Sequence, residues 1–142
     1  MTEQSMSTGS GDGVIKSSLD LPTNFEFAFK IKGNTNYGLF LKPTTDQRSL
    51  DGFFDGNTIY VQANTTNSST YVRSSINGHS TSTYYSYKFI VEGTNVRMFI
   101  NDTEYTSASG CSWLSEFSSF NVGWGTWGSG TFYWKDILIK PL

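Results

Sequence analysis

Residues 120–142, FNVGWGTWGSGTFYWKDILIKPL, decide the fold. They predict two β-strands, residues 120–124 and 131–140, joined by a loop rich in glycine and tryptophan. Aromatic and β-branched residues dominate the second run, and such residues fit a pleated strand better than a helix. We therefore predict that the second strand lies inside a sheet and that the upstream strands pack around this closing pair.

The second strand of this pair changes its apolar face along its length. Under strict alternation Phe132 and Trp134 share one face, whereas Ile137 and Ile139 fall on the other. Either both faces are covered, or a β-bulge near residues 135–136 changes the parity. Both alternatives predict that Trp134 is buried.

The composition suits one uncharged, polar-surfaced domain with an aromatic core. The chain has 142 residues, 37% of them hydrophobic and 16% aromatic, while charged residues make up 15% and the net charge is −2. This charge does not attract phosphate backbones or anionic lipids, so we predict neither nucleic acid nor membrane insertion. No apolar run approaches the length of a membrane span. Surfaces built from Ser, Thr, Asn and Gly are common on extracellular and virion proteins.

The N-terminal residues 1–13, MTEQSMSTGSGDG, are small and polar and predict a flexible tail or linker. Residues 14–142 are predicted to form a single β-sandwich domain. Cys111 is the one cysteine, so no intramolecular disulfide can form, and we predict a buried structural thiol.

Period-two alternation marks the other strands. Residues 25–32, FEFAFKIK, predict a half-buried antiparallel strand, and residues 37–42 are its predicted hairpin partner. Residues 84–91 and 96–101 predict the best hairpin of the sequence, joined by EGTN.

Weaker patterns fill the rest of the chain. Shorter strands are predicted at residues 14–21, 59–63, 71–74 and 104–106. Residues 44–57 predict a polar loop, and residues 112–117 predict one helical turn with its apolar side chains pointing inward. About ten short strands with almost no helix predict an all-β fold, a two-sheet antiparallel β-sandwich.

The order of FEFAFKIK, YGLFLKP, YYSYKFIVEGTNVRMFIND, FNVGW and GTFYWKDILIKPL resembles the concanavalin A-like lectin/glucanase superfamily, in its laminin-G-like or carbohydrate-binding-module branches. The resemblance covers residues 14–142 and rests on strand order and pattern. It implies a jelly roll of two antiparallel sheets. It also implies glycan binding on the concave sheet or at loop edges, as in many members.

The acidic residues do not match a catalytic pattern. Enzymes of that superfamily use closely spaced acidic residues on one strand, because glycoside hydrolysis needs two carboxyl groups at the same bond. No Glu-x-Asp-x-x-Glu pattern occurs, which leaves only a pair assembled from separate strands. His79, the one histidine, is predicted to be a solvated loop residue rather than a base or metal ligand. We predict that the protein is not an enzyme.

A metal is a lesser alternative. Residues 51–57, DGFFDGN, supply oxygen ligands of the kind that calcium accepts in irregular loops. The spacing is not that of an EF-hand, and Asp-Gly pairs are ordinary turn formers. We predict no cofactor, with calcium at this segment as the alternative.

The aromatic residues point to a glycan site. A sugar ring stacks its apolar C–H face on Trp or Tyr, while its hydroxyls need polar partners. Trp127 and Trp124 stand among glycines that leave ring faces open, although Trp124 could instead plug the end of the sandwich. The secondary candidates are Tyr71, Arg73, Tyr84 and Asn95.

We therefore predict a non-catalytic carbohydrate-binding or adhesion module of a viral tail or fibre or of a cell-surface protein. Its partner would be a glycan or cell-surface polysaccharide, and its location extracellular or on a virion. The alternative is a structural or protein-docking domain whose tryptophans lie in the core or at a subunit interface. A homo-oligomer or a larger parent assembly would then provide the partner surface.

Overall fold

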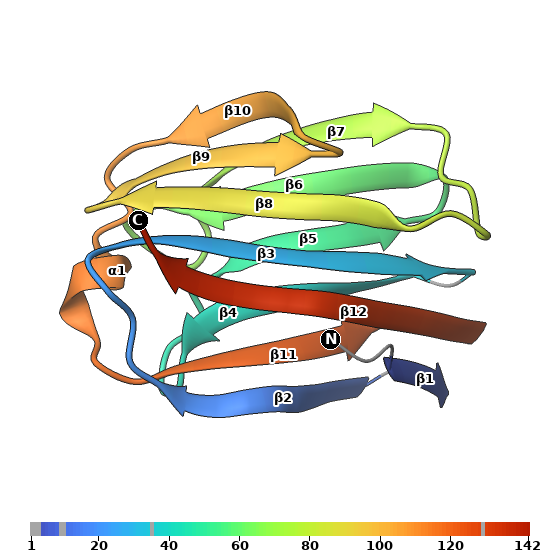
Figure 1. The fold of residues 1–142 in the computed structure, drawn as a ribbon, viewed down its shortest axis with the longest axis horizontal. Coiled ribbons are helices and arrows are strands. Elements are labelled where there is room, and N and C mark those ends of the chain that lie inside the picture. The colour runs from blue at the N-terminus through green and yellow to red at the C-terminus, as the bar shows by residue number, and fades with distance from the viewer. Residues whose placement is uncertain (1–3, 9–10, 35, 129) are drawn as a thin grey trace.

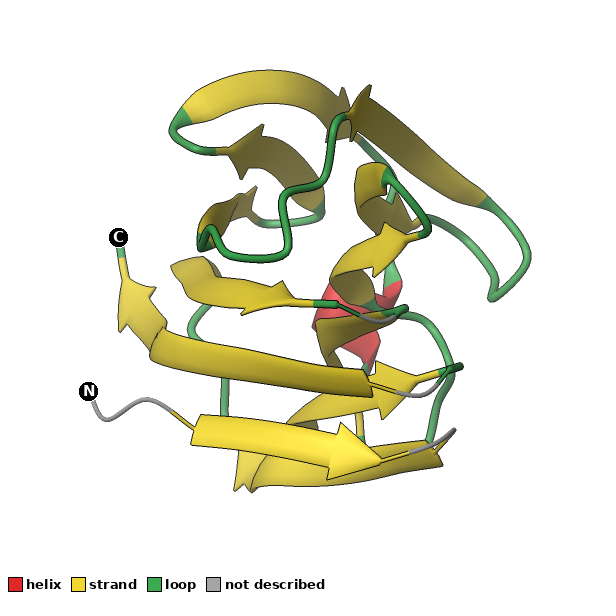
Figure 2. Ribbon diagram, turned by 90° about the vertical axis from the view of Figure 1, so that its right-hand side faces the viewer, coloured by secondary structure: helices red, strands yellow, loops and turns green. Residues whose placement is uncertain are grey.

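The computed structural model describes residues 4–8, 11–34, 36–128 and 130–142, and in it two antiparallel sheets lie face to face (Figures 1 and 2). Sheet A contains, in spatial order, β1 (Gln4–Thr8), β12 (Gly130–Pro141), β3 (Asn24–Gly33), β8 (Tyr85–Glu92), β9 (Asn95–Ile100) and β10 (Thr103–Ala108). Sheet B contains β2 (Gly11–Leu19), β11 (Phe120–Thr126), β4 (Tyr37–Pro43), β5 (Leu50–Asp55), β6 (Thr58–Asn64) and β7 (Tyr71–Asn77).

One helical turn, α1 (Trp113–Glu116), lies at one end of the sandwich (Figure 1). The predicted all-β, two-sheet antiparallel β-sandwich is confirmed, and so is the single helical turn. No helix in the described part of the chain is long and apolar enough to cross a membrane.

The core lies between the sheets and follows the predicted alternation. On β3 the inward residues are at most 2% exposed; they are Phe25, Phe27, Phe29 and Ile31. The ring of Phe29 stacks on that of Tyr87 in β8, with 5.0 Å between ring centroids. Burial of each such side chain stabilises the fold by about 1.5–3 kcal/mol. The predicted β8–β9 hairpin is also confirmed, because the two strands pair from Glu92 and Asn95 onward.

A bulge in β12 resolves the parity problem of the closing strand. The register with β3 shifts between Lys135 and Leu138, and Asp136 adopts a φ of 55°. As a result Trp134 and Ile137 are both buried, although they are three residues apart, whereas Leu138 is 40% exposed. Of the two alternatives left by the sequence, the bulge is the one that occurs.

One predicted strand pairing is wrong, and the two closing strands lie in different sheets. The closing strands do not pair with each other, because β11 lies between β2 and β4 in sheet B while β12 lies between β1 and β3 in sheet A. In the same way β3 and β4 belong to different sheets and form no hairpin. Both short links cross from one sheet to the other. Each of these strands has one apolar face that must be buried. When two consecutive strands lie in different sheets, stacked about 10 Å apart, the apolar face of each is buried against the other sheet.

The predicted tail over residues 1–13 is also wrong where the structure describes it. Residues 4–8 pair with β12, and β2 already begins at Gly11 and pairs with β11. Residues 1–3 and 9–10 lie outside the described part. Strand pairing uses backbone groups alone, so a polar sequence without apolar alternation can join a sheet edge.

The predicted loop over residues 44–57 contains strand β5. Leu50 and Phe54 are fully buried and point inward together with Gly52. A Cβ at Gly52 would lie 2.4 Å from the ring of Tyr87, so only glycine lets β8 pack this closely. Because glycine interrupts the apolar alternation, the sequence pattern of this strand is weak.

Two predictions about single residues have different outcomes. Cys111 is buried as predicted, and burial raises the pKa of its thiol to about 11. His79 is half-buried rather than solvated, because its ring stacks on Phe54 with 3.8 Å between centroids. Its Nδ1 atom also lies 3.2 Å from the carbonyl oxygen of Gly56, so the chain after β7 is held against the core.

We expect the bulge to depend on a residue that tolerates positive φ at position 136. Asp136→Val should be less stable than Asp136→Asn by about 1–2 kcal/mol, because a β-branched residue is strained in this region whereas Asn adopts it readily. Both changes remove the exposed Lys30–Asp136 ion pair, so the difference between them does not contain that ion pair. Urea unfolding of the two variants measures it, and equal stability would contradict this account of the bulge.

Candidate functional site

The outward-facing side chains of sheet B form two neighbouring rows. Strand pairing places one row side by side across β11, β4, β5 and β6; it consists of Gly125, Gly38, Phe53 and Tyr60. The adjacent row consists of Phe40, Asp51, Gln62 and Arg73 across β4, β5, β6 and β7. The inward residues of β4, β5 and β6 are buried, so the row residues on these strands face away from the core, and strand pairing places Gly125 and Arg73 on the same face.

A hollow of about 290 Å³ opens on this face. Its lining includes Gly38 and Gly125, which are paired neighbours on β4 and β11. A Cβ at Gly38 would lie 2.3 Å from the Cβ of Phe53, and one at Gly125 would lie 2.7 Å from Oδ1 of Asp12. The two glycines therefore allow Phe53 and Asp12 to lean toward each other over the sheet.

Aromatic rings continue from this hollow across the sheet. Trp127 is 44% exposed, and its ring meets that of Phe53 edge-on at 5.7 Å between centroids. Phe53 stacks on Tyr60 at 4.9 Å. The guanidinium of Arg73 lies 4.8 Å from the ring centroid of Tyr60 and 4.7 Å from that of Tyr71. Rings in this arrangement give a continuous aromatic surface with a cation fixed at one end.

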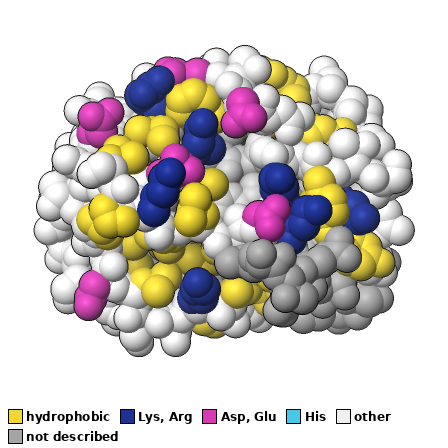
Figure 3. All heavy atoms as spheres, in the orientation of Figure 1, with side chains coloured by type: hydrophobic (Ala, Val, Ile, Leu, Met, Phe, Trp, Pro, Cys, Tyr) yellow, Lys and Arg dark blue, Asp and Glu magenta, His cyan; other side chains and the backbone are white. Residues whose placement is uncertain are grey.

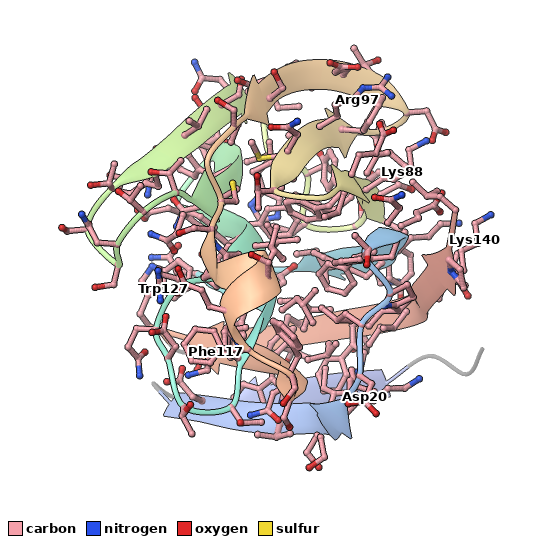
Figure 4. All side chains as sticks on the ribbon, turned by 90° about the vertical axis from the view of Figure 1, so that its left-hand side faces the viewer. Asp20, Lys88, Arg97, Phe117, Trp127 and Lys140 are labelled. Atoms are coloured by element: carbon pink, nitrogen blue, oxygen red, sulfur yellow. The ribbon has the colours of Figure 1, made fainter. Side chains whose placement is uncertain are left out.

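The loop after β11 holds Trp127 at the edge of this platform. Its backbone N–H donates a 3.1 Å hydrogen bond to the carbonyl oxygen of Asn36 in the link before β4. Figure 4 shows Trp127 on the side of the molecule opposite Lys88 and Lys140, which belong to sheet A. The exposure predicted for Trp127 is confirmed.

Polar side chains connect the aromatic platform to the hollow. Arg73 donates from Nε and one terminal nitrogen to Oε1 of Gln62, at 2.8 and 2.7 Å. Nε2 of Gln62 donates to Oδ2 of Asp51 at 2.8 Å, and the Ser49 hydroxyl donates to the same oxygen at 2.9 Å. Among the described residues, none donates a hydrogen bond to Oδ1 of Asp51. This oxygen therefore remains an acceptor for a ligand.

Burial raises the pKa of the Asp51 carboxyl above its ordinary value. Hydrogen bonds from Gln62 and Ser49 and the charges of Arg73 and Lys42 act in the opposite direction but do not cancel the burial. Two hydrogen bonds hold the Asp51 carboxylate in one orientation, and burial makes its charged form unfavourable. Such a group is oriented to accept a hydrogen bond before a ligand binds.

The structure brings together three of the six residues predicted for the site. Trp127, Tyr71 and Arg73 lie on the outer face of sheet B, joined through Phe53 and Tyr60. They had been singled out separately, from a glycine-rich loop and from a short strand. Their proximity follows from the strand order β11-β4-β5-β6-β7.

Trp124 is not on this face. It belongs to β11 rather than to the loop, and its ring is half-buried and packs toward Phe132, with 6.0 Å between centroids. A Cβ at Gly13 of β2 would lie 2.3 Å from the Trp124 ring, so the indole covers that glycine. Trp124 therefore packs inside the sandwich, which was the alternative left open by the sequence.

Tyr84 and Asn95 belong to sheet A. Tyr84 lies just before β8. The Lys135 ammonium lies 4.2 Å from the centroid of its ring, and the Lys32 ammonium lies 4.7 Å from it. Asn95 is exposed at the first position of β9, at the far end of the β8–β9 hairpin. Figure 3 shows the outer face of sheet A, on which Lys and Arg side chains are interspersed with Asp and Glu. Neither residue lies near the hollow.

Sequence reasoning missed most residues that line the hollow. Phe53 and Asp51 were placed in a loop, and Asp12 was placed in the tail. Gln62 and Tyr60 had a usable signal, because Ile59, Val61 and Ala63 alternate with them and point inward. That alternation alone predicts that the pair faces outward.

The segment considered for calcium is mostly extended. Leu50–Asp55 forms β5, so Asp51 and Asp55 lie on one face but about 13 Å apart along the strand. A single ion does not reach both carboxylates at that separation. Within the described residues, no three His, Cys, Asp or Glu side chains gather in a group that could hold a metal ion.

Comparison with known proteins identifies the fold. No protein-family model matches the chain, and no curated protein matches it. Solved structures do match, among them carbohydrate binding module CBM66 from Bacillus subtilis, with a TM-score of 0.64 and 14% identity over 95% of this chain and 84% of that one. Sheep galectin-11 matches with a TM-score of 0.57 and 10% identity, over 94% and 98% of the two chains.

An alginate lyase also matches, with a TM-score of 0.62 and 8% identity over 87% of this chain and 65% of that one. These identities are low, so the likeness concerns the fold alone. The chain has the jelly-roll fold of these proteins. The predicted resemblance to the concanavalin A-like superfamily is confirmed at that level.

We expect Asp51→Asn to change how stability depends on pH. Burial raises the folded-state pKa of Asp51, so this group favours folding when protonated and loses that contribution as pH rises through its folded pKa. The variant should be at least as stable as the parent at neutral pH, and its advantage should shrink on acidification. Thermal unfolding between about pH 4 and pH 8 measures this, with Asp55→Asn as an exposed control. If the stability advantage of Asp51→Asn over the parent grew on acidification, the raised pKa of Asp51 would be contradicted.

Proposed function

We propose that the chain is a non-catalytic carbohydrate-binding module whose glycan site is the hollow on the outer face of sheet B. The observation that carries this proposal is the convergence of aromatic rings, carboxylates and an amide around two adjacent glycines. A sugar ring can stack its C–H face on the exposed ring of Trp127, with Phe53 edge-on beside it, while its hydroxyls donate to Asp12 or to Asp51. The jelly-roll fold, shared with a carbohydrate binding module and a galectin, supports the same conclusion.

The spacing of the carboxylates supports a binding role rather than glycoside hydrolysis. Asp12 pairs with Gly125 on β11, and Asp51 lies three strands further into the sheet than β2. Three strand spacings separate them by about 14 Å. This separation is that of the backbones; the carboxyl groups of glycosidase pairs lie about 5–9.5 Å apart, so the wide spacing of the two strands favours a binding role over a pair that flanks one bond. His79, stacked on Phe54, lines a different part of the surface.

Adhesion is the setting that we propose for this module, as part of an extracellular or virion protein. Its uncharged polar surface supports that setting. The rival is a protein-docking or oligomerisation domain, in which the exposed rings of Trp127 and Tyr71 would cover a partner. Oδ1 of Asp51, which accepts no hydrogen bond from the described residues, and the small volume of the hollow favour a small polar ligand over a flat protein surface.

We expect Trp127→Ala to weaken glycan binding about five- to tenfold, because a lost aromatic contact is worth about 1 kcal/mol or somewhat more. Stability should hardly change, since the side chain is exposed and lies outside the core. A glycan array would first identify the strongest ligand, and calorimetric titration would then compare parent and variant.

Two variants serve as controls for this experiment. Tyr105→Ala removes a ring of similar exposure on β10, far from the hollow, and should leave binding unchanged. Trp134→Ala removes a buried ring and should cost about 3–5 kcal/mol of stability. A large fall in the melting temperature of Trp127→Ala would show that Trp127 stabilises the fold rather than binding a ligand. A stable oligomer that binds no glycan on the array would favour the docking domain.

A further inference from the structure

We propose that the hollow selects uncharged glycans and rejects sugars that carry a carboxylate or a sulfate. This inference rests on the proposed function and specifies the ligand class of the same site. Three observations support it. The charged residues that line the hollow are acidic, no lysine or arginine among the described residues lines it, and its polar atoms are mainly hydrogen-bond acceptors.

The charged side chains that line the hollow are both acidic. Asp12 stands on β2 at one side and Asp51 on β5 at the other. A ligand that crosses β11 and β4 between them meets a carboxylate in either orientation. Repulsion from Asp51, which is shielded from water, and from Asp12 disfavours an anion between them.

The nearest cations are held outside the hollow. Two nitrogens of Arg73 donate to Oε1 of Gln62, and its guanidinium packs on Tyr60 and Tyr71. The ammonium of Lys42 lies 5.6 Å from the ring centroid of Phe40. Within the described residues, no lysine or arginine side chain lines the hollow. An incoming anion would therefore meet no cation in the lining itself, although the charges of Arg73 and Lys42 reach Asp51 from outside the hollow.

The polar atoms of the hollow are mainly acceptors. Oδ1 of Asp51 has no donor among the described residues, and the exposed carboxylate of Asp12 adds further acceptor atoms. Oε1 of Gln62 already accepts two hydrogen bonds from Arg73, and its amide donates to Asp51. Sugar hydroxyls are donors that match such acceptors, whereas carboxylate and sulfate groups bring only further acceptors.

Cations gather instead on the opposite side of the molecule. Lys32 and Lys135 flank Tyr84 on sheet A, and Figure 3 shows further Lys and Arg side chains on that face. Acidic polysaccharides could attach there without using the hollow. Binding that is lost when Trp127 is replaced must use the hollow, because Trp127 lies on the side of the molecule opposite these cations (Figure 4).

Affinity electrophoresis in native gels tests the inference. The neutral probes are galactomannan, xyloglucan, laminarin and soluble starch, and the acidic probes are alginate, polygalacturonate and carrageenan. We expect at least one neutral probe to retard the protein, and Trp127→Ala to reduce that retardation to the extent that a five- to tenfold loss of affinity implies. No acidic probe should give retardation that depends on Trp127. Binding to the neutral probe should not change between about 0.05 and 0.5 M salt, since no net charge attraction contributes.

Charge variants sharpen the same test. Asp12→Asn should weaken binding to the neutral probe about tenfold, because hydrogen bonds to a charged acceptor are the stronger kind. Asp20→Asn removes an exposed carboxylate outside the hollow and serves as the control with the same change in net charge. An unchanged affinity in both Asp12→Asn and Asp51→Asn would overturn the role of the acceptors.

The remaining outcomes distinguish this inference from the proposed function. Retardation by an acidic probe that is lost in Trp127→Ala would overturn the selection of uncharged glycans and leave a glycan-binding site in place. Failure of every probe and of a glycan array would overturn the proposed function, and this inference with it.

Discussion

The contact between the two sheets determines where the candidate site lies. A β-strand points alternate side chains to opposite faces, so each residue that a strand buries forces its neighbours outward. On β6 the side chains of Ile59, Val61 and Ala63 are fully buried, which leaves Tyr60 and Gln62 on the outer face. The site consists of residues that the core does not use, and the core fixes their positions.

Glycines act on both faces of this sheet for the same steric reason. Gly52 points inward from β5, where a side chain would collide with the ring of Tyr87 on the facing sheet. Gly38 points outward from β4, where a side chain would collide with Phe53. One glycine brings the sheets together and the other lets a ring lean over the backbone. Both weaken the strand pattern in the sequence, so the residues beside the hollow were hardest to predict.

Local periodicity could be predicted from the sequence, whereas the sheet to which each strand belongs could not. The alternation of β3 and the hairpin of β8 and β9 are properties of neighbouring residues, and both are confirmed. The short link after β3 contains asparagine and the one after β11 contains glycine, and both residue types suit a hairpin turn equally well. Those links cross between the sheets, and only packing of the complete core decides that outcome. The edge strand β2 carries no clear apolar pattern because little of its surface is buried.

The contrast between Trp124 and Trp127 shows how much of the site depends on parity. Phe120 and Val122 are buried on β11, so Trp124 falls on the inward face by alternation. Trp127 is three positions further along and therefore has the opposite parity, which matches its place on the outer face. An even spacing between the tryptophans would have placed both on one side. The sequence contains this parity once Val122 is assigned to the core, although both tryptophans share the same glycine-rich surroundings. Composition identified the ring, and alternation decides whether it packs in the sandwich or faces a ligand.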